Sequence, residues 1–201
     1  MGNYVFANQK GGVGKTTVTL GIAAELAARG RRVLLIDLDA QASATKVVGI
    51  DLDGGPSMAD VMLEPDRDEL RHAISTTGWG FDLAPSETAL ASRESRRSTA
   101  DEFVLRRQLA RCRGYDVVLV DCPPSLGVLT LNALAAASHL VVVTEPSFLA
   151  LQGIEELLET RDLVCAHYNP RARPGGRCGE PRRADSRAPR RPGRDHELLR
   201  S

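Results

Sequence analysis

Short runs of consecutive apolar residues alternate along this chain with longer segments in which apolar residues recur every three or four positions. The runs predict buried β-strands at 4–7, 33–36, 79–83, 117–120 and 140–143. The periodic segments predict helices at 16–29, 57–63, 66–74, 87–94, 99–111, 126–137 and 149–167. In the first helix, Val18, Ile22, Ala23 and Leu26 form the expected apolar face, and Gly30 is the expected C-cap.

Strands that are apolar throughout are typical of a parallel sheet covered by helices on both faces. The sequence therefore predicts an α/β fold with a mostly parallel sheet. Right-handed crossovers place the carboxyl ends of the strands at one edge, where open α/β sheets bind their ligands. Asp37, Asp39 and Asp121 follow two predicted strands, and a glycine-rich loop follows the first. We expect these residues to meet at that edge.

The glycine-rich loop lies between a predicted strand and a predicted helix. Its residues are Lys10-Gly11-Gly12-Val13-Gly14-Lys15-Thr16-Thr17. Backbone N–H groups from 11 to 17 would form a nest for phosphate oxygens, aided by the positive end of the following helix. Lys15 would neutralise the β- and γ-phosphates of ATP, and Thr16 would offer its hydroxyl to Mg²⁺. The usual first glycine of such loops is replaced by Gln9, which makes this a deviant form of the motif.

Composition supports a phosphate site and a reducing compartment. Only Lys10, Lys15 and Lys46 are lysines among 26 basic residues, and two of them lie in the loop. An ammonium is a compact charge that suits a phosphate cradle better than a planar guanidinium does. The four cysteines form no C-x-x-C pair, which favours reduced structural thiols. We see no signal peptide and no apolar run that could span a bilayer, and we expect a cytoplasmic protein.

Residues 169–201 differ in character from the rest of the chain. From 171 onward there are ten arginines against four acidic residues, which leaves sixteen basic and twenty-two acidic residues before it. This Arg/Pro/Gly-rich segment lacks a hydrophobic period, so we predict one domain at 1–168 and a disordered basic C-terminal tail at 169–201. The tail could contact DNA phosphates non-specifically. Alternatively it is an out-of-frame or truncated end, which we favour because nothing in folding physics ends an α/β sheet there.

With these motifs the chain resembles the ParA/MinD family of P-loop ATPases, and most closely its short, Soj-like branch. The resemblance covers about 4–167 and includes, beyond the loop, the segments 33–41, 84–86, 115–127 and 131–134. It implies a P-loop NTPase-type fold, ATP and Mg²⁺ as cofactors, and a homodimer formed with ATP. It also implies a ParB-like activator, non-specific DNA binding, a nucleoid-associated location and no stable membrane association.

The resemblance also assigns roles to single residues. It implies that Lys10 crosses the dimer interface to the partner's phosphates, and that Asp39 positions the attacking water. Lys15 would act within its own chain, and Asp121 would hold Mg²⁺ together with Thr16. Simpler roles stay open, since Asp39 could cap a turn, Asp121 could start one, and Asp37 could be structural. Ala40 stands where the family usually has proline.

Four functions are compatible with this resemblance. The leading hypothesis is an ATP-driven dimer switch in chromosome or plasmid partitioning, with slow ATP hydrolysis stimulated by the ParB-like partner. A MinD-like membrane-cycling ATPase would require an amphipathic terminal helix, for which 196–201 is too short. An iron–sulfur relative would require cysteines that converge at a dimer axis, and Cys122 and Cys165 do not resemble that placement. A nucleotide-binding fragment without turnover stays open because the family's adenine-binding and DNA-contacting segments have no visible counterpart.

Overall fold

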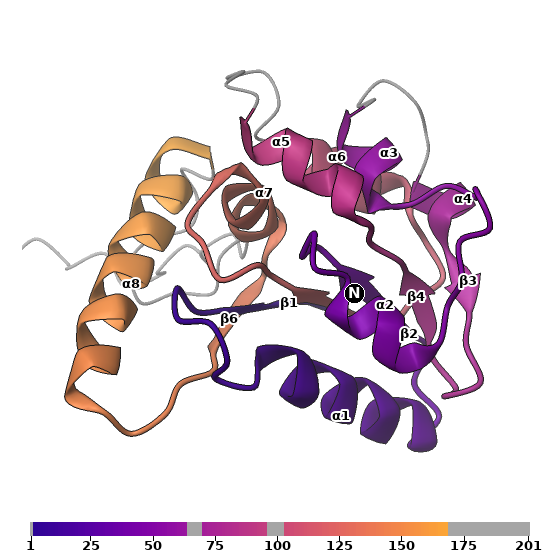
Figure 1. Cartoon of the computed structure of the whole chain (residues 1–201), viewed down its shortest axis with the longest axis horizontal. Helices are drawn as coiled ribbons and strands as arrows, with labels where there is room; N and C mark the ends of the chain where they lie inside the picture. Colours follow the sequence, from indigo (N-terminus) through magenta and orange to yellow (C-terminus); the bar gives the residue numbers. More distant parts are fainter. Residues whose placement is uncertain (1, 64–69, 96–102, 169–201) are drawn as a thin grey trace, which may run out of the picture.

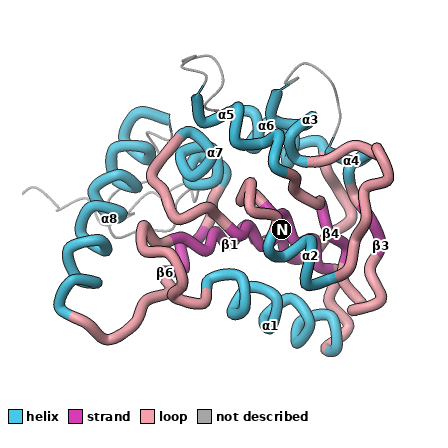
Figure 2. Tube along the Cα trace, viewed as in Figure 1, coloured by secondary structure: helices cyan, strands magenta, loops and turns pink. Residues whose placement is uncertain are grey.

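The computed structural model describes residues 2–63, 70–95 and 103–168. Its elements follow one another along the chain as β1 (Gly2–Ala7), α1 (Lys15–Ala28), β2 (Val33–Asp37), α2 (Ser43–Val48), α3 (Met58–Leu63), α4 (Leu70–Ala73), β3 (Ser75–Thr76), β4 (Asp82–Ala84), the 3₁₀ helix η1 (Thr88–Leu90), α5 (Ala91–Ser95), α6 (Val104–Arg111), β5 (Val117–Asp121), α7 (Val128–Ala136), β6 (His139–Val142) and α8 (Phe148–Tyr168). Figures 1 and 2 show them as one sheet with helices on both sides. The predicted tail at 169–201 lies outside the described residues.

The sheet confirms the predicted α/β architecture. Its six strands are ordered β3-β4-β2-β5-β1-β6, and every neighbouring pair is parallel except β3 with β4. In register, Asp37 of β2 lies opposite Asp121 of β5, and Phe6 of β1 lies opposite the same Asp121. The carboxyl ends of the three central strands therefore meet at one edge, as the sequence predicted.

Alternate residues of the strands face two hydrophobic clusters. Val33 and Leu35 of β2 pack with Leu20 and Ala23 of α1, whereas Leu34 and Ile36 pack with residues of α3, α6 and α7. Both faces of the sheet are thus covered, which explains why its strands are apolar throughout. In Figure 1, α1 lies below the sheet and α3, α5 and α6 lie above it.

Helix α1 has a different buried face from the predicted one. Lys15, Thr19, Leu20 and Ala23 are its buried residues, while Val18 is 39% exposed and Ile22 37% exposed. The reason lies at the start of the helix, where the Thr16 hydroxyl donates to Asp121 Oδ2 at 2.6 Å and the Thr19 hydroxyl lies 3.5 Å from Asp121 Oδ1. The polar Lys15–Thr19 side must face the strand ends, and this rotates the helix away from its most apolar stripe. The Gly30 cap is confirmed, with φ of 75° and its N–H donating to the Ala27 carbonyl at 2.8 Å.

The segment before β4 was predicted incorrectly. The strand expected at 79–83 is confirmed only at its end, as β4, while residues 79–81 form a turn, because Gly80 adopts φ of 82° and the Thr77 hydroxyl donates to the Phe81 carbonyl at 2.5 Å. Trp79 lies in this turn, is 46% exposed, and has its ring centroid 6.3 Å from that of Phe81. The short antiparallel β3 and the helix α2 were not predicted.

The boundaries of the other predicted helices are confirmed in part. The helix predicted at 57–63 is α3, and Ser57 caps it, since the Ser57 hydroxyl accepts the Ala59 N–H at 3.0 Å. The helices predicted at 66–74 and 99–111 are present as α4 from Leu70 and as α6 from Val104, where Phe103 is the N-cap, while residues 66–69 and 99–102 lie outside the described ranges. The remaining predicted helices are present with ends that shift by a few residues.

Candidate nucleotide-binding site

The glycine-rich loop adopts backbone conformations that require glycine at two positions. Gly12 has φ of 77° and Gly14 has φ of 88°, both in the left-handed region, and a Cβ on either would have nothing within 4 Å. Backbone geometry therefore demands these glycines, whereas space does not. Gly14 is the N-cap of α1, so the positive end of a fourteen-residue helix points into the loop. This geometry is compatible with the anion nest predicted at Gly11, Gly12, Val13 and Gly14, which stays a prediction.

Lys15 and Thr16 begin α1 and turn toward the strand ends. Lys15 is only 7% exposed, and its Nζ donates to the Lys10 carbonyl at 3.3 Å, so the ammonium lies back along the loop. The Thr16 hydroxyl donates to Asp121 Oδ2 at 2.6 Å. The two residues predicted to share Mg²⁺ are thus in direct contact, although 105 positions separate them in the chain. Thr17, the last predicted loop residue, lies exposed in the first turn of α1.

Asp121 lies in an environment that opposes its negative charge. Burial raises the pKa of Asp121 to about 7, the Thr16 hydrogen bond lowers it, and the nearby Asp37 carboxylate raises it again. The Thr19 hydroxyl lies 3.5 Å from Asp121 Oδ1 as a second donor. A divalent cation bound between the Thr16 hydroxyl and this carboxylate would offset the cost of ionising it. The oxygen donors and their charge therefore fit Mg²⁺, which prefers one or two carboxylates completed by phosphate and water.

Asp37 has a structural role. It is fully buried, and its Oδ2 accepts the Thr45 N–H at 2.9 Å and the Thr45 hydroxyl at 2.8 Å. Its Oδ1 accepts the Asp39 N–H at 3.2 Å. Burial raises the pKa of Asp37, and the Thr45 hydrogen bonds counteract that rise. Asp37 thereby fastens both ends of the 38–45 segment to the end of β2.

Asp39 lies directly after β2, at the predicted edge of the sheet, and it also closes a turn, which is the simpler role that we left open. Its Oδ1 accepts the Gln41 N–H at 2.9 Å and its carbonyl accepts the Ala42 N–H at 2.8 Å, which closes a turn before α2. Ala42 adopts φ of 52° in that turn. The Asp39 side chain is only half-buried, so its second oxygen stays available to a ligand at the sheet edge.

Lys10 contacts the segment that follows β6 rather than the ends of β2 and β5. Its backbone N–H donates to Asn8 Oδ1 at 3.0 Å, and its Nζ forms an ion pair with Glu145, which follows β6. Both side chains are close to half exposed. The predicted site residues thus fall into two groups. Lys15, Thr16, Asp39 and Asp121 are associated with the strand ends, while Lys10 lies at the rim of the loop.

Sequence reasoning missed several residues that build this site. Thr19 and Thr45 hold the two carboxylates, and Asn8 ties the loop to β6 through its Nδ2, which donates to the Val143 carbonyl at 2.7 Å. Thr19 stands four residues after Lys15 on α1, a spacing that would have placed both side chains on one face. Thr45 and Asn8 carry no comparable sequence signal, because their partners are distant in the chain.

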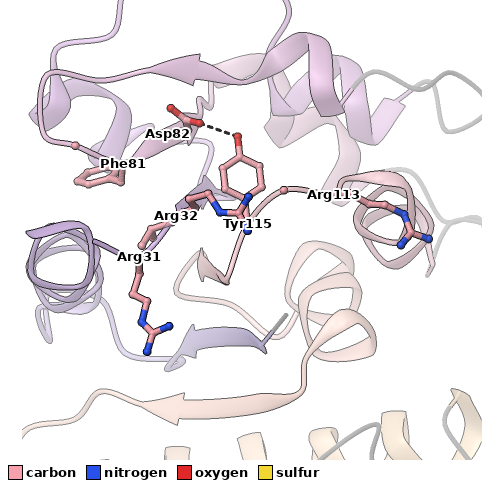
Figure 3. Close-up of a pocket in the computed structure, with 9 residues that line it drawn as sticks. Arg31, Arg32, Phe81, Asp82, Arg113 and Tyr115 are labelled. Atoms are coloured by element: carbon pink, nitrogen blue, oxygen red, sulfur yellow. Dashed lines mark hydrogen bonds between the residues drawn. The ribbon is translucent and has the colours of Figure 1, made fainter. Parts of the chain in front are cut away.

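A cavity of about 340 Å³ lies at the opposite edge of the sheet. It is lined by residues that precede or begin β2, β4 and β5, namely Arg31, Arg32, Val33, Gly80, Phe81, Asp82, Arg113, Gly114 and Tyr115. The Tyr115 hydroxyl donates to Asp82 at 2.8 Å (Figure 3), while Arg31 and Arg113 point away from each other. The guanidinium groups do not converge, so the cavity lacks the geometry of an anion site. It is also separate from every predicted site residue.

Other kinds of site are not indicated in the described residues. Within 2–63, 70–95 and 103–168, three or more His, Cys, Asp or Glu side chains do not gather as a metal site. Cys112, Cys122 and Cys165 are free and buried, and Cys178 lies outside the described residues. None of the described helices is long and apolar enough to cross a membrane.

Comparison with known proteins agrees with this geometry. Residues 2–173 match the family model AAA_31, described as an AAA domain. The chain is 42% identical over 167 residues to the chromosome-partitioning ATPase Soj of Thermus thermophilus, covering 83% of this chain and 64% of that protein. It is 40% identical over 172 residues to the chromosome partitioning protein ParA of Myxococcus xanthus, covering 82% of this chain and 59% of that protein. The chain therefore spans less than two thirds of the length of these two relatives.

A solved structure supports the same assignment. Cobyrinic acid a,c-diamide synthase from Mycobacterium smegmatis, crystallised with an ATP analog and magnesium, superposes with a TM-score of 0.78 at 42% identity, covering 85% of this chain and 70% of that one. The family model covers most of the chain, and the matches to the two relatives cover 83% and 82% of it. The chain belongs to the AAA_31 family of AAA domains and is a relative of the Soj and ParA chromosome-partitioning ATPases.

Proposed function

We propose that this chain binds Mg-ATP at its glycine-rich loop and acts as an ATP-dependent dimer switch in chromosome or plasmid partitioning. The observation that carries the proposal is the contact between Thr16 and Asp121, 2.6 Å apart at the foot of a loop whose glycines have positive φ. A nucleoside triphosphate is held by a helix N-terminus, a buried lysine and a hydroxyl–carboxylate pair, and all three are present at this loop. The similarity to the Soj and ParA chromosome-partitioning proteins supports a role in partitioning.

Each residue has a distinct task in the proposed reaction. Backbone N–H groups of the loop bind and orient the phosphates, and the Lys15 ammonium leaves the Lys10 carbonyl to contact them. Thr16 and Asp121 would hold Mg²⁺, which supplies electrostatic neutralisation of the phosphate oxygens when bound. Asp39 orients the attacking water from the half-buried turn before α2. Lys10 reaches the phosphates of a second chain and makes ATP part of the dimer interface.

The switch follows from this division of labour. A single chain holds ATP but lacks the Lys10 charge of its partner, so hydrolysis is slow until two chains meet. The dimer binds DNA without sequence preference, and a ParB-like partner accelerates hydrolysis and returns the chain to monomers. The synthase name of the Mycobacterium smegmatis neighbour points to a different use of the same phosphate loop, and the DNA experiment below separates the two.

Nucleotide binding is tested first by titrating the purified chain with a fluorescent ATP analog in the presence of Mg²⁺. Lys15→Ala should weaken binding at least tenfold, because it removes the one ammonium buried beside the loop. Arg29→Ala removes a positive charge from the far end of the same helix, where Arg29 pairs with Glu25 on the surface, and should change binding by less than twofold. Equal affinities of the two variants for the ATP analog would refute the proposal that ATP binds at this loop.

The switch is tested by retention of the chain on long non-specific DNA with Mg-ATP, with ADP and without nucleotide. We expect retention only with Mg-ATP, and none for Lys15→Ala. Identical retention in all three conditions would eliminate the switch, and binding of Mg-ATP without any retention would favour a synthase-type or other use of the loop.

A further inference from the structure

Two oppositely charged side chains from distant parts of the chain meet beside the glycine-rich loop. Lys10 Nζ forms an ion pair with Glu145, and the two side chains are 48% and 46% exposed. The hydrogen bond from Lys10, followed by the Lys10 charge, lowers the pKa of Glu145, so the carboxylate is ionised at neutral pH. Glu145 lies between β6 and α8, outside every motif that the sequence analysis identified.

The backbone around this pair is anchored on both sides. Asn8 is buried, its Nδ2 donates to the Val143 carbonyl at 2.7 Å, and its Oδ1 accepts the Lys10 N–H at 3.0 Å. One side chain thus ties the start of the loop to the end of β6, two residues before Glu145. Glu145 Oε1 also accepts a hydrogen bond from the Ser147 hydroxyl at 3.4 Å. The carboxylate is therefore held where the Lys10 side chain passes.

We infer that Glu145 is a positioning residue that keeps Lys10 within its own chain until a second, ATP-loaded chain offers its phosphates instead. The inference rests on the proposed function, in which Lys10 acts across the dimer interface. A triphosphate carries several negative charges and the carboxylate carries one, so the phosphates are the stronger partner once they are within reach. Because both side chains are exposed, the ammonium can move from one partner to the other without crossing the core.

The expected effect on the dimer dissociation constant is small for each ion pair, but a symmetric dimer contains two such pairs. An exposed ion pair changes an equilibrium by a factor of about two to three. Two chains must each release one pair to form a symmetric dimer, so removing the pair should lower the dimer dissociation constant by about four- to ninefold. Added salt screens exposed charges, so the difference should largely disappear at high ionic strength.

The first experiment asks whether Glu145 holds Lys10 in the nucleotide-free chain. The chain has three lysines, so acylation by a water-soluble succinimidyl ester followed by mass spectrometry resolves each one. Glu145→Gln should speed acylation of Lys10 by about two- to threefold relative to Lys46, which donates to the Gln41 carbonyl elsewhere on the surface. Glu155→Gln, which removes an exposed charge from the adjoining helix α8, should leave the ratio unchanged. An unchanged ratio in Glu145→Gln would overturn the inference.

The second experiment asks whether the pair opposes dimerisation. Sedimentation with Mg²⁺ and a slowly hydrolysed ATP analog should show tighter dimers for Glu145→Gln than for wild type or Glu155→Gln. The gain should be absent when Lys10→Gln is also present, because the cycle isolates the coupling of the two side chains. Faster acylation without tighter dimers would overturn the link to dimerisation. If no variant dimerises with the analog, the proposed dimer switch fails, and the acylation ratio alone decides whether Glu145 holds Lys10.

Discussion

Replacing Thr45 with valine should destabilise the fold by removing one hydroxyl that serves two buried partners. That hydroxyl donates to Asp37 Oδ2 at 2.8 Å and accepts the Ser86 N–H at 2.9 Å. Asp37 is fully buried, Ser86 is 1% exposed and Thr45 is 4% exposed, so water cannot replace the lost partner at low cost. Valine has nearly the same shape as threonine, so the substitution removes hydrogen bonds without opening a cavity.

The magnitude follows from the two groups that lose their partner. An unsatisfied buried donor or acceptor costs about 1–3 kcal/mol. With one donor and one carboxylate oxygen affected, and with the Thr45 N–H still bonded to Asp37, we expect Thr45→Val to lose about 2–4 kcal/mol of the free energy of unfolding. Thr45→Ser keeps the hydroxyl and removes only a methyl group, which should cost about 1 kcal/mol.

Urea denaturation followed by far-ultraviolet circular dichroism measures both variants at neutral pH. The expected order of stability is wild type, then Thr45→Ser, then Thr45→Val, with unchanged denaturant slopes. If valine proved as stable as serine at this position, the hydroxyl would not be the link between β2, α2 and the end of β4. The argument that Asp37 anchors the Asp39 turn through Thr45 would then have to be abandoned.

Three further predictions concern the site and its surroundings. Burial places the pKa of Asp121 at about 7 in the folded chain against 3.8 for the ordinary group, so its ionisation lowers stability as pH rises between these values. In nucleotide-free and Mg²⁺-free buffer, the stability advantage of Asp121→Asn over wild type should therefore grow by about 2–3 kcal/mol from pH 5 to pH 8, and an advantage independent of pH would contradict it. Gly21→Ala in the middle of α1 should stabilise the chain by about 0.5–1 kcal/mol, whereas Gly14→Ala, with φ of 88°, should destabilise it by about 1–2 kcal/mol. Neither added Cβ would meet an atom within 4 Å, so backbone conformation alone should separate the two variants. Melting temperatures that changed in the same direction would contradict this. Tyr115→Phe removes the 2.8 Å hydrogen bond to Asp82 and should cost about 1 kcal/mol in urea denaturation, with no change in ATP binding because the cavity lies at the other edge of the sheet.

Local pattern was sufficient for the central strands and for the loop. Val33–Asp37 and Val117–Asp121 are apolar because both faces of the sheet are covered, and that continuous pattern is readable without coordinates. Gly12 and Gly14 were identifiable because their left-handed conformations admit few other residues. The common edge of Asp37, Asp39 and Asp121 followed from parallel topology, which needs only the order of strands and helices.

The pattern failed in two places, one decided by a long-range contact and the other by a local turn. The predicted apolar face of α1 is partly exposed, because the polar side that carries Lys15 and Thr19 is directed toward Asp121. The start of the strand predicted at 79–83 is a turn before β4, because Gly80 and the Thr77 hydroxyl close it locally. Neither result can be deduced from hydrophobic period alone, since each depends on a partner that the period does not encode.

Residue types and their spacing along the chain were enough to indicate an α/β sheet, a phosphate loop and the acidic residues at the strand ends. Which side chains join them was decided by tertiary structure: Thr45 to Asp37, Thr19 to Asp121, Asn8 to β6, and Glu145 to Lys10. The physical reason is that backbone conformation depends on near neighbours, whereas the partner of a buried or charged side chain depends on which distant segments the closed sheet brings within hydrogen-bonding reach.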